Sequence, residues 1–189
     1  MHQAAGGRMS FALRAALPAD VPALRDLIAR SARALSAGYY SGAQIEGALQ
    51  GAFGVDAALI EDGTYFAVVT DQGEIVACGG WGRRRTLFGS SSRAERDESR
   101  LDPRTEAARI RAFFVDPAYA RHGLARMLLE HSESEARLAG FTTMELMATL
   151  PGIPFYERCG YARGAPLDYP VPGGVHLPMV AMHKRIAPG

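Results

Sequence analysis

The sequence has 189 residues, of which 48% are hydrophobic and 22% are charged, and its formal net charge is +1. This length suits one domain with its own hydrophobic core. The near-neutral charge excludes a global electrostatic attraction to nucleic acid or to anionic membranes. Any anion that the protein binds must therefore be recognised by a local arrangement of groups. Two cysteines, Cys78 and Cys159, are too few for a disulfide framework and are expected to be free thiols.

Targeting and membrane signals are not found in the sequence. No apolar run approaches the roughly 18 residues that a membrane-spanning helix needs, and the first nine residues, MHQAAGGRM, contain no apolar stretch typical of a signal peptide. We expect residues 1–9 to be a disordered leader and the protein to be cytoplasmic, with no membrane partner.

The first third of the chain is predicted to hold a strand and two helices. A short strand is expected around Phe11 to Ala15. A helix then follows Asp20, a plausible N-cap, with Pro22 in its first turn, and it ends before Gly38. Its apolar residues recur at helical spacing: Leu24, Leu27, Ile28, Ala32 and Leu35. A second helix is expected after Ser41, with Ile45, Ala48 and Leu49 on one side.

A strand-rich region comes next. The short apolar run Ala57 to Ile60 is predicted to be a strand, and Tyr65 to Thr70 and Ile75 to Trp81 are predicted to be two more. The last two are joined by Asp71-Gln72-Gly73-Glu74, a short polar turn that indicates an antiparallel hairpin.

The segment from Arg83 to Arg104 differs in composition from its surroundings. It is rich in Arg, Ser, Asp and Glu and offers little that could be buried, which is typical of an exposed, mobile loop inserted between strands. A nucleic-acid-binding arm is the alternative. Acidic residues interspersed among the arginines largely cancel their charge, so the loop is favoured and no nucleic-acid partner is expected.

The remaining segment is predicted to alternate strands and helices. Strands are expected at Ile110 to Val115, at Thr142 to Ala148 and at about Met179 to Lys184, and a short helix at Pro154 to Cys159. A longer helix is expected from Leu124 to Ala139, with Gly140 in the C-cap region. Its predicted stripe consists of Leu124, Met127, Leu128, His131, Glu135 and Leu138. Together these elements predict an α/β (α+β) fold with a mixed sheet of six or seven strands and about four helices.

One loop between a strand and a helix carries the chemical signal. Gly123 lies at the start of the predicted helix, where backbone N–H groups have no partner within the helix and the helix dipole is positive. Because glycine has no side chain, a phosphate can approach the backbone closely. Arg121 and Arg126 add positive charge at the rim. The sequence contains neither GxxxxGK[ST] nor GxGxxG, so it lacks the signatures of a P-loop and of a dinucleotide fold.

Two motifs resemble those of the GCN5-related N-acetyltransferase (GNAT) superfamily. Its pyrophosphate loop, (Arg/Gln)-x-x-Gly-x-(Gly/Ala), aligns with Ala120 to Ala125, where Ala120 departs from the usual Arg or Gln. Downstream, Pro151 to Tyr161 reads PGIPFYERCGY and is similar to the family's late FYEKxGF segment. The opening LRAALPADVPAL and the hairpin GEIVACGGW add to the resemblance, which covers nearly the whole chain.

This resemblance implies a single acetyltransferase domain over residues 10–187, with a mostly antiparallel sheet, the inserted loop at about 83–104 and acetyl-CoA as the acetyl-donor cosubstrate. The implied cofactor-binding residues are Phe114, Val115, Arg121, His122, Gly123, Leu124, Ala125 and Arg126. The family places a tyrosine beside the cofactor sulfur, which here is Tyr156. A phenol with a pKa of about 10 is protonated at neutral pH and can donate a proton to a departing thiolate.

The general base is not assigned by the sequence. Many family members have a Glu in the fourth strand at the position of Arg111, and the nearest substitutes are Glu106, Glu145 and His176. A weakly basic amine needs no dedicated base. The histidines and cysteines show no ligand spacing for a metal.

Three functions are compatible with these motifs. The favoured one is acetyl-CoA-dependent transfer of an acetyl group to a primary amine of a small molecule, directly within a ternary complex. The alternatives are a non-catalytic acyl-CoA-binding sensor and a protein acetyltransferase acting on lysines or N-termini. The segments that select the acceptor are the first two helices and the inserted loop, and no acidic cluster typical of a polyamine site occurs there. Homodimers are common in the family, so a homodimer is also compatible with the sequence.

Overall fold

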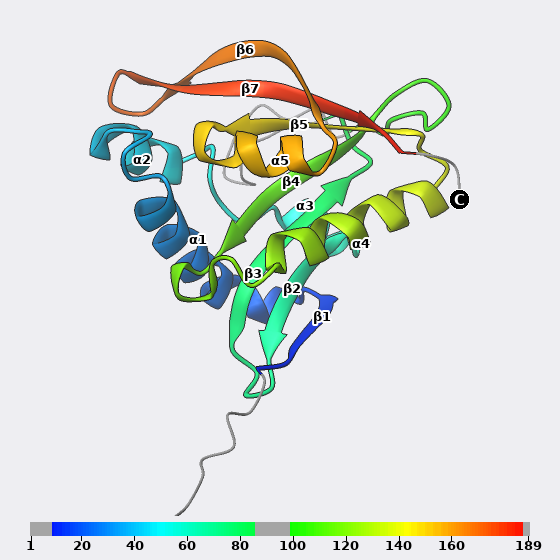
Figure 1. Ribbon diagram of the computed structural model, residues 1–189, viewed down its shortest axis with the longest axis horizontal. Coiled ribbons are helices and arrows are strands. Elements are labelled where there is room, and N and C mark those ends of the chain that lie inside the picture. Colours follow the sequence, from blue (N-terminus) through cyan, green and yellow to red (C-terminus); the bar gives the residue numbers. More distant parts are fainter. Residues whose placement is uncertain (1–8, 86–98, 187–189) are drawn as a thin grey trace, which may run out of the picture.

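A seven-stranded mixed sheet in the order β1-β2-β3-β4-β5-β7-β6 organises the fold (Figure 1). The computed structural model describes residues 9–85 and 99–186. The strands are β1 (Phe11–Ala15), β2 (Tyr65–Thr70), β3 (Ile75–Gly82), β4 (Ala108–Val115), β5 (Thr143–Thr149), β6 (Ala162–Val171) and β7 (Val175–Arg185). All neighbours pair antiparallel except β4 and β5. The predicted α/β class and strand number are confirmed.

Helices cover both faces of the sheet. They are α1 (Val21–Leu35), α2 (Gly42–Leu49), α3 (Ala57–Glu61), α4 (Leu124–Leu138) and α5 (Ile153–Arg158), with short 3-10 turns η1 (Pro18–Asp20), η2 (Pro117–Tyr119) and η3 (Leu150–Gly152). In Figure 1, α4 and α5 lie in front of the sheet and α3 lies behind it. Buried side chains form two clusters, one beneath α4 and α5 and the other beneath α1, α2 and α3. We call these two sides the α4 face and the α1 face.

The α1 helix forms largely as its hydrophobic period predicts. Four residues of the predicted stripe, Leu24, Leu27, Ile28 and Ala32, are at most 3% exposed, whereas Leu35 at the helix end is 39% exposed. Asp20 precedes the helix as expected, but its carboxylate makes no cap hydrogen bond to α1. It accepts instead from the Leu17 N–H at 2.8 Å and from the Arg14 guanidinium, because the η1 turn directs it back toward β1.

The α2 helix begins with a capping box formed by Ser41 and Gln44. The Ser41 hydroxyl accepts from the Gln44 N–H at 3.2 Å, and the Gln44 side chain accepts from the Ser41 N–H at 2.8 Å. These two bonds satisfy donors that would otherwise have no partner at the helix start. Position 41 is therefore confirmed as the residue preceding the second helix.

The run Ala57–Ile60, predicted to be a strand, is instead the helix α3. The Asp56 side chain caps it by accepting from the Ala58 N–H at 3.2 Å. Only Leu59 of this helix is fully buried. A four-residue apolar run does not distinguish a buried strand from a short helix by its period, and the preceding Asp favours the helix here.

The α4 helix spans the predicted residues, but its buried stripe is rotated. Leu138, placed in the core by the predicted stripe, is 81% exposed, and Ser132 and Ala136 are buried instead. The buried residues of α4 in the structure include Leu124, Leu128, Leu129, Ser132 and Ala136. Gly140 follows the helix with φ of +92°, a left-handed conformation that suits glycine at this position.

The strand β6 was not among the predicted elements. It pairs antiparallel with β7 at the edge of the sheet, and most of its residues are exposed, so it lacks the alternation of a half-buried strand. Pro166 and Pro170 lie in it, and proline is tolerated on an edge strand because its missing N–H would face solvent. The last strand, predicted from Met179, begins at Val175 because it pairs with β6.

The predicted leader and much of the predicted inserted loop lie outside the described residues. On either side of that gap, Arg84 and Arg100 form an isolated antiparallel bridge, and Leu101 is 5% exposed within the core cluster of the α4 face. No helix among the described residues is long and apolar enough to cross a membrane.

Two glycines of β3 each allow a neighbouring group to approach closely. A Cβ at Gly80 would collide with the Thr64 carbonyl oxygen, and one at Gly79 would collide with the Phe113 ring. The Thr64 carbonyl cannot easily move, because it accepts from the Trp81 N–H at 3.0 Å.

We expect Gly80→Ala to lower the free energy of unfolding by about 1–3 kcal/mol, the usual range for overpacking a rigid site. The control is Gly51→Ala, where an added Cβ meets no atom within 4 Å, and it should leave the urea midpoint nearly unchanged. Equal midpoints for the two variants in urea denaturation would contradict the close approach.

Candidate functional site

The two parallel strands at the centre of the sheet separate along their length. β4 and β5 pair only at Ala108↔Met144 and Arg109↔Glu145. Beyond these pairs the strands diverge, so the last residues of β4 keep backbone partners on β3 only, as at Cys78↔Phe114 and Ala77↔Val115. The divergence opens the sheet in its middle and leaves the end of β4 without a neighbouring strand on its β5 side.

A bulge in β4 produces this divergence. The pairing register with β3 shifts between Cys78 and Gly80, and Ala112 in the opposing segment has φ of +52°. Alanine in the left-handed region is strained by roughly 1–2 kcal/mol, so the surrounding structure must impose this conformation. The fully buried Tyr65 contributes, because its hydroxyl donates to the Ala112 carbonyl at 3.1 Å.

The bulge decides which side chains face which side of the sheet. Arg111 pairs with the buried Asp56 beneath α3, and Ala112 packs in the cluster of the α1 face. Phe114 also packs there, while Phe113 and Val115 pack on the α4 face. Two successive residues thus share one face before the alternation resumes, as a β-bulge requires.

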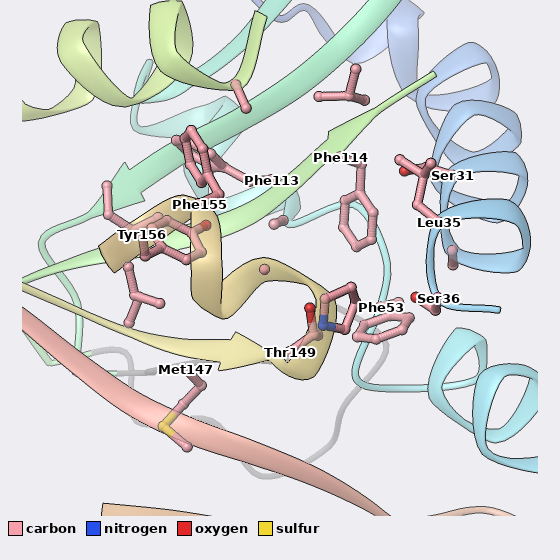
Figure 2. A pocket seen from close by; sticks show the side chains of 18 of the residues that line it. Ser31, Leu35, Ser36, Phe53, Phe113, Phe114, Met147, Thr149, Phe155 and Tyr156 are labelled. Atoms are coloured by element: carbon pink, nitrogen blue, oxygen red, sulfur yellow. The ribbon is translucent and has the colours of Figure 1, made fainter. Parts of the chain in front are cut away.

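A cavity of about 260 Å³ occupies the opening between the strands. Its lining residues come from both hydrophobic clusters, so it connects the α4 face with the α1 face. Figure 2 shows Phe113, Phe155 and Tyr156 on one side and Phe53, Phe114, Ser31 and Leu35 on the other, with Thr149 nearby. A cavity that crosses the sheet can hold two ligands, one entering from each face.

Four of the predicted site residues line this cavity. They are Phe114 and Val115 at the end of β4, Ala125 in the first turn of α4, and Tyr156 in α5. Phe113, Phe155 and Gly152 line it as well. The other predicted residues, Arg121, His122, Gly123, Leu124 and Arg126, lie at the start of α4 and are not among the described lining residues.

The loop before α4 has the geometry of an anion cradle. Arg121 and Gly123 have φ of +70° and +80°, and Gly123 is the N-cap of α4 without a side-chain cap. Within the described residues, the backbone N–H groups of residues 121–126 have no backbone acceptor. Several unpaired donors thus surround the positive end of a 15-residue helix.

Gly123 is not required by packing. A Cβ there would meet no atom within 4 Å, so the space beside it is open, and only the left-handed φ demands glycine. The Leu124 side chain is 1% exposed and anchors the helix in the core, while Arg121 and Arg126 are exposed at the rim. The His122 ring packs edge-on against the Phe11 ring, with their centroids 6.0 Å apart. The loop therefore fits a phosphate group bound by backbone.

Asp116 holds the chain between β4 and this loop. Its carboxylate accepts from the Ala118 N–H at 2.9 Å and pairs with Arg30 of α1 at 2.9 Å, and its N–H donates to the Val76 carbonyl at 2.8 Å. These bonds tie the loop to α1 and β3, so the cradle starts from a fixed position.

The Tyr156 phenol is buried and faces the cavity. Its ring packs edge-on against the rings of Phe155 and Tyr161, with centroid distances of 5.0 Å and 5.7 Å. Among the described residues its hydroxyl has no hydrogen-bond partner. Burial raises the pKa of Tyr156 above the usual value of a phenol, and nearby Cys159 adds to the rise. The group stays protonated at neutral pH and can donate into the cavity.

The wall on the α1 face is mainly apolar. It is built by the end of α1, the segment between α2 and α3, the ends of β4 and β5, and β7. Its residues are Ser31, Ala32, Leu35, Ser36, Ala52, Phe53, Phe114, Met147, Thr149 and Met179. The Phe53 and Phe114 rings lie edge to face, with their centroids 5.6 Å apart and their planes at 71°. The sequence pointed to the first two helices as acceptor-selecting segments but assigned none of these wall residues to the acceptor, and it named Phe114 as a cofactor-binding residue.

Arg111 lines the cavity at the position where the family resemblance implied a glutamate. Its guanidinium pairs with Asp56 at 2.6 Å, and the two side chains are 3% and 0% exposed. The same Asp56 carboxylate caps α3. A fixed ion pair therefore occupies the position at which the resemblance would have placed a base.

The suggested substitute bases lie elsewhere. Glu106 pairs with Arg85, Glu145 pairs with Arg109, and His176 lies 3.0 Å from Asp168 in the β6–β7 hairpin. None of the three is among the described lining residues of the cavity. No group of three or more His, Cys, Asp or Glu side chains in the described parts of the chain is placed to hold a metal ion.

Comparison with solved structures identifies similar folds. The GCN5-related N-acetyltransferase from Rhodopseudomonas palustris matches with a TM-score of 0.71 at 20% identity, over 95% of this chain and 98% of that one. The PaiA N-acetyltransferase from Thermoplasma acidophilum, solved with coenzyme A, matches with a TM-score of 0.63 at 14% identity, over 93% and 99% of the chains. The ribosomal-protein-S18-alanine N-acetyltransferase from Escherichia coli matches with a TM-score of 0.60 at 19% identity, over 94% and 95%.

Comparison of sequences identifies the family. No curated protein sequence matches the chain. The model of the acetyltransferase (GNAT) family, by contrast, matches residues 25–161, a range that holds α4, its preceding loop and Tyr156. Because that match covers most of the chain, the protein belongs to the acetyltransferase (GNAT) family.

Proposed function

We propose that the protein is an acetyl-CoA-dependent N-acetyltransferase that transfers an acetyl group to a primary amine of a small molecule. The observation that carries this proposal is the cavity that crosses the sheet between β4 and β5. On the α4 face it lies next to the donor-rich start of α4. On the α1 face it is lined by side chains suited to a second, smaller ligand.

The cofactor-binding residues follow from this arrangement. The N–H groups of residues 121–126 would hold the pyrophosphate, with Gly123 leaving room and Arg121 and Arg126 adding charge. Main-chain groups of Phe114 and Val115, which have no partner on β5, would bond the amides of the pantetheine arm. Bound acetyl-CoA supplies a thioester as the activated acetyl group.

The residues around the cavity would then support direct transfer. The amine nitrogen forms a bond to the acetyl carbon, and the carbon–sulfur bond breaks with its electron pair going to sulfur. The Tyr156 phenol donates its proton to that sulfur. The phenolate recovers a proton from the new amide nitrogen, directly or through water, so that the products are an amide and a free thiol. Holding the amine and thioester together would supply a large part of the rate enhancement.

The limited size of the cavity supports a small-molecule acceptor. At about 260 Å³ it falls below the roughly 300–1,000 Å³ typical of pockets for drug-sized ligands. Part of that volume must also admit the end of the pantetheine arm. The space left on the α1 face suits a compact amine.

The cofactor assignment is tested with Gly123→Glu. We expect the wild type to bind acetyl-CoA, and the variant, which places bulk and negative charge in the cradle, to lose at least tenfold in affinity by calorimetry, on the order of 1.4 kcal/mol.

The control for strain is Gly63→Glu. Gly63 also has a left-handed φ, +71°, and open space around its missing Cβ, but it lies in the turn before β2. This variant should bind acetyl-CoA like the wild type. If the wild type binds neither acetyl-CoA nor free CoA, or if both variants lose affinity equally, the cradle assignment is wrong.

The role of Tyr156 is tested with Tyr156→Phe. Loss of a general acid should lower kcat, measured as the rate of release of free CoA, by roughly 10²–10⁴-fold. The Kd for acetyl-CoA, measured by calorimetry, should change little. Because burial raises the pKa of Tyr156, the wild type should not lose activity between pH 7 and 9 through ionisation of this phenol.

The matched control is Tyr161→Phe. The Tyr161 hydroxyl donates to Glu133 at 3.1 Å, so its removal should lower Tm while kcat stays within about twofold. If Tyr156→Phe keeps the wild-type kcat, the assignment of Tyr156 as proton donor is wrong. A wild type that binds acetyl-CoA but transfers nothing to any amine would favour the sensor alternative.

A further inference from the structure

The acceptor side of the cavity has the chemistry of a site for an aromatic ring. Its apolar wall is formed by Leu35, Ala52, Phe53, Phe114, Met147 and Met179. The Phe53 and Phe114 rings meet edge to face at 5.6 Å, and two methionine thioethers complete the surface. Aromatic rings pack favourably against both ring edges and thioethers.

The charge at this wall disfavours a cationic acceptor. The charged side chain among the described lining residues is that of Arg111, a cation. Its partner Asp56 is 0% exposed and is already engaged by Arg111 and by the Ala58 N–H, so an incoming ammonium group cannot reach it. Such a group would lose its water beside a guanidinium, which is a large cost for a charge without a partner.

Apart from Arg111, the polar side chains at the wall are neutral. The hydroxyls of Ser31, Ser36 and Thr149 line the cavity, and Ser31 and Ser36 are 4% and 6% exposed. A hydroxyl can accept a hydrogen bond from an uncharged N–H group. These side chains can therefore orient an NH₂ group without requiring it to be charged.

The attack itself needs an uncharged nitrogen. A primary alkylamine like that of lysine has a pKa of about 10.4, so roughly one molecule in 2,500 is neutral at pH 7, and a base must remove its proton. The described lining of the cavity includes Arg111 but no Asp, Glu or His side chain that could remove this proton. An aromatic amine shares its nitrogen lone pair with the ring and is already neutral at pH 7, so it needs no such base.

We propose that the acceptor is a small, uncharged aromatic amine whose ring packs between Phe53, Phe114 and the methionines of the α1 face. This inference rests on the proposed function and gives it a substrate class. The step is the one given above: the arylamine nitrogen bonds to the acetyl carbon, the carbon–sulfur bond breaks toward sulfur, and Tyr156 transfers the proton. The products are an N-aryl acetamide and free CoA.

The experiment compares two isomers, 4-methylaniline and benzylamine, with the full-length protein and acetyl-CoA. They have the same atoms and nearly the same size, but at pH 7 the first is neutral and the second is a cation. We expect kcat/KM for 4-methylaniline to be higher by at least about tenfold. Its kcat/KM should be flat from pH 6 to 9, whereas any activity on benzylamine should rise with pH as the amine loses its proton.

A carboxylate introduced into the wall should change this preference. Ala52→Asp gives an ammonium group a partner, so kcat/KM for benzylamine should rise and that for 4-methylaniline should fall. Ala52→Asn adds the same bulk without charge, and it should keep the wild-type order of the two isomers. Tm values of both variants show whether they are folded.

Two outcomes would overturn the aromatic-amine inference while the proposed function stands. One is a protein that binds acetyl-CoA and acetylates benzylamine, spermidine or a lysine peptide better than 4-methylaniline. The other is a CoA-bound protein to which neither 4-methylaniline nor its acetamide binds, as judged by saturation-transfer NMR. Failure to bind acetyl-CoA in calorimetry, by contrast, would remove the proposed function itself.

Discussion

The bulge at Ala112 is the constraint on which the site depends. A left-handed alanine inside a strand is unfavourable, and it persists because Tyr65 bonds its carbonyl and because Gly79 leaves room for the Phe113 ring. The bend that follows separates β4 from β5 after two residue pairs. Without it, a continuous parallel ladder would close the sheet, and the two faces would not communicate.

The two ends of the cavity differ in what they offer a ligand. At the start of α4, the hydrogen-bond donors are backbone N–H groups, so no particular side chain is needed except the absence of one at Gly123. This explains how Ala120 can stand where the family motif usually has Arg or Gln. On the α1 face, recognition depends on side chains, and these are apolar or neutral except for Arg111, which Asp56 holds in place. A region that binds through its backbone thus adjoins a wall that binds through its side chains.

Errors in the sequence-based prediction have identifiable physical causes. The run Ala57–Ile60 was too short for its period to separate helix from strand, and the Asp56 cap decided the outcome. The exposed edge strand β6 carries no alternating pattern because it buries few side chains. In α4 the apolar residues Met127 and Leu138 suggested one stripe, whereas packing against the sheet buried Ser132, Glu133 and Ala136.

The sequence by itself determined the local features: the class of fold, most helices and strands, the glycine at the helix start, and the family motifs around Gly123 and Tyr156. These depend on residues close together in the chain, where periodicity, capping and backbone conformation act. The tertiary structure alone decided the cavity, its wall on the α1 face and the pairing of Arg111 with Asp56. Those features join α1, the α2–α3 segment, β4, β5 and β7, and such contacts arise from packing between distant segments, which no local pattern encodes.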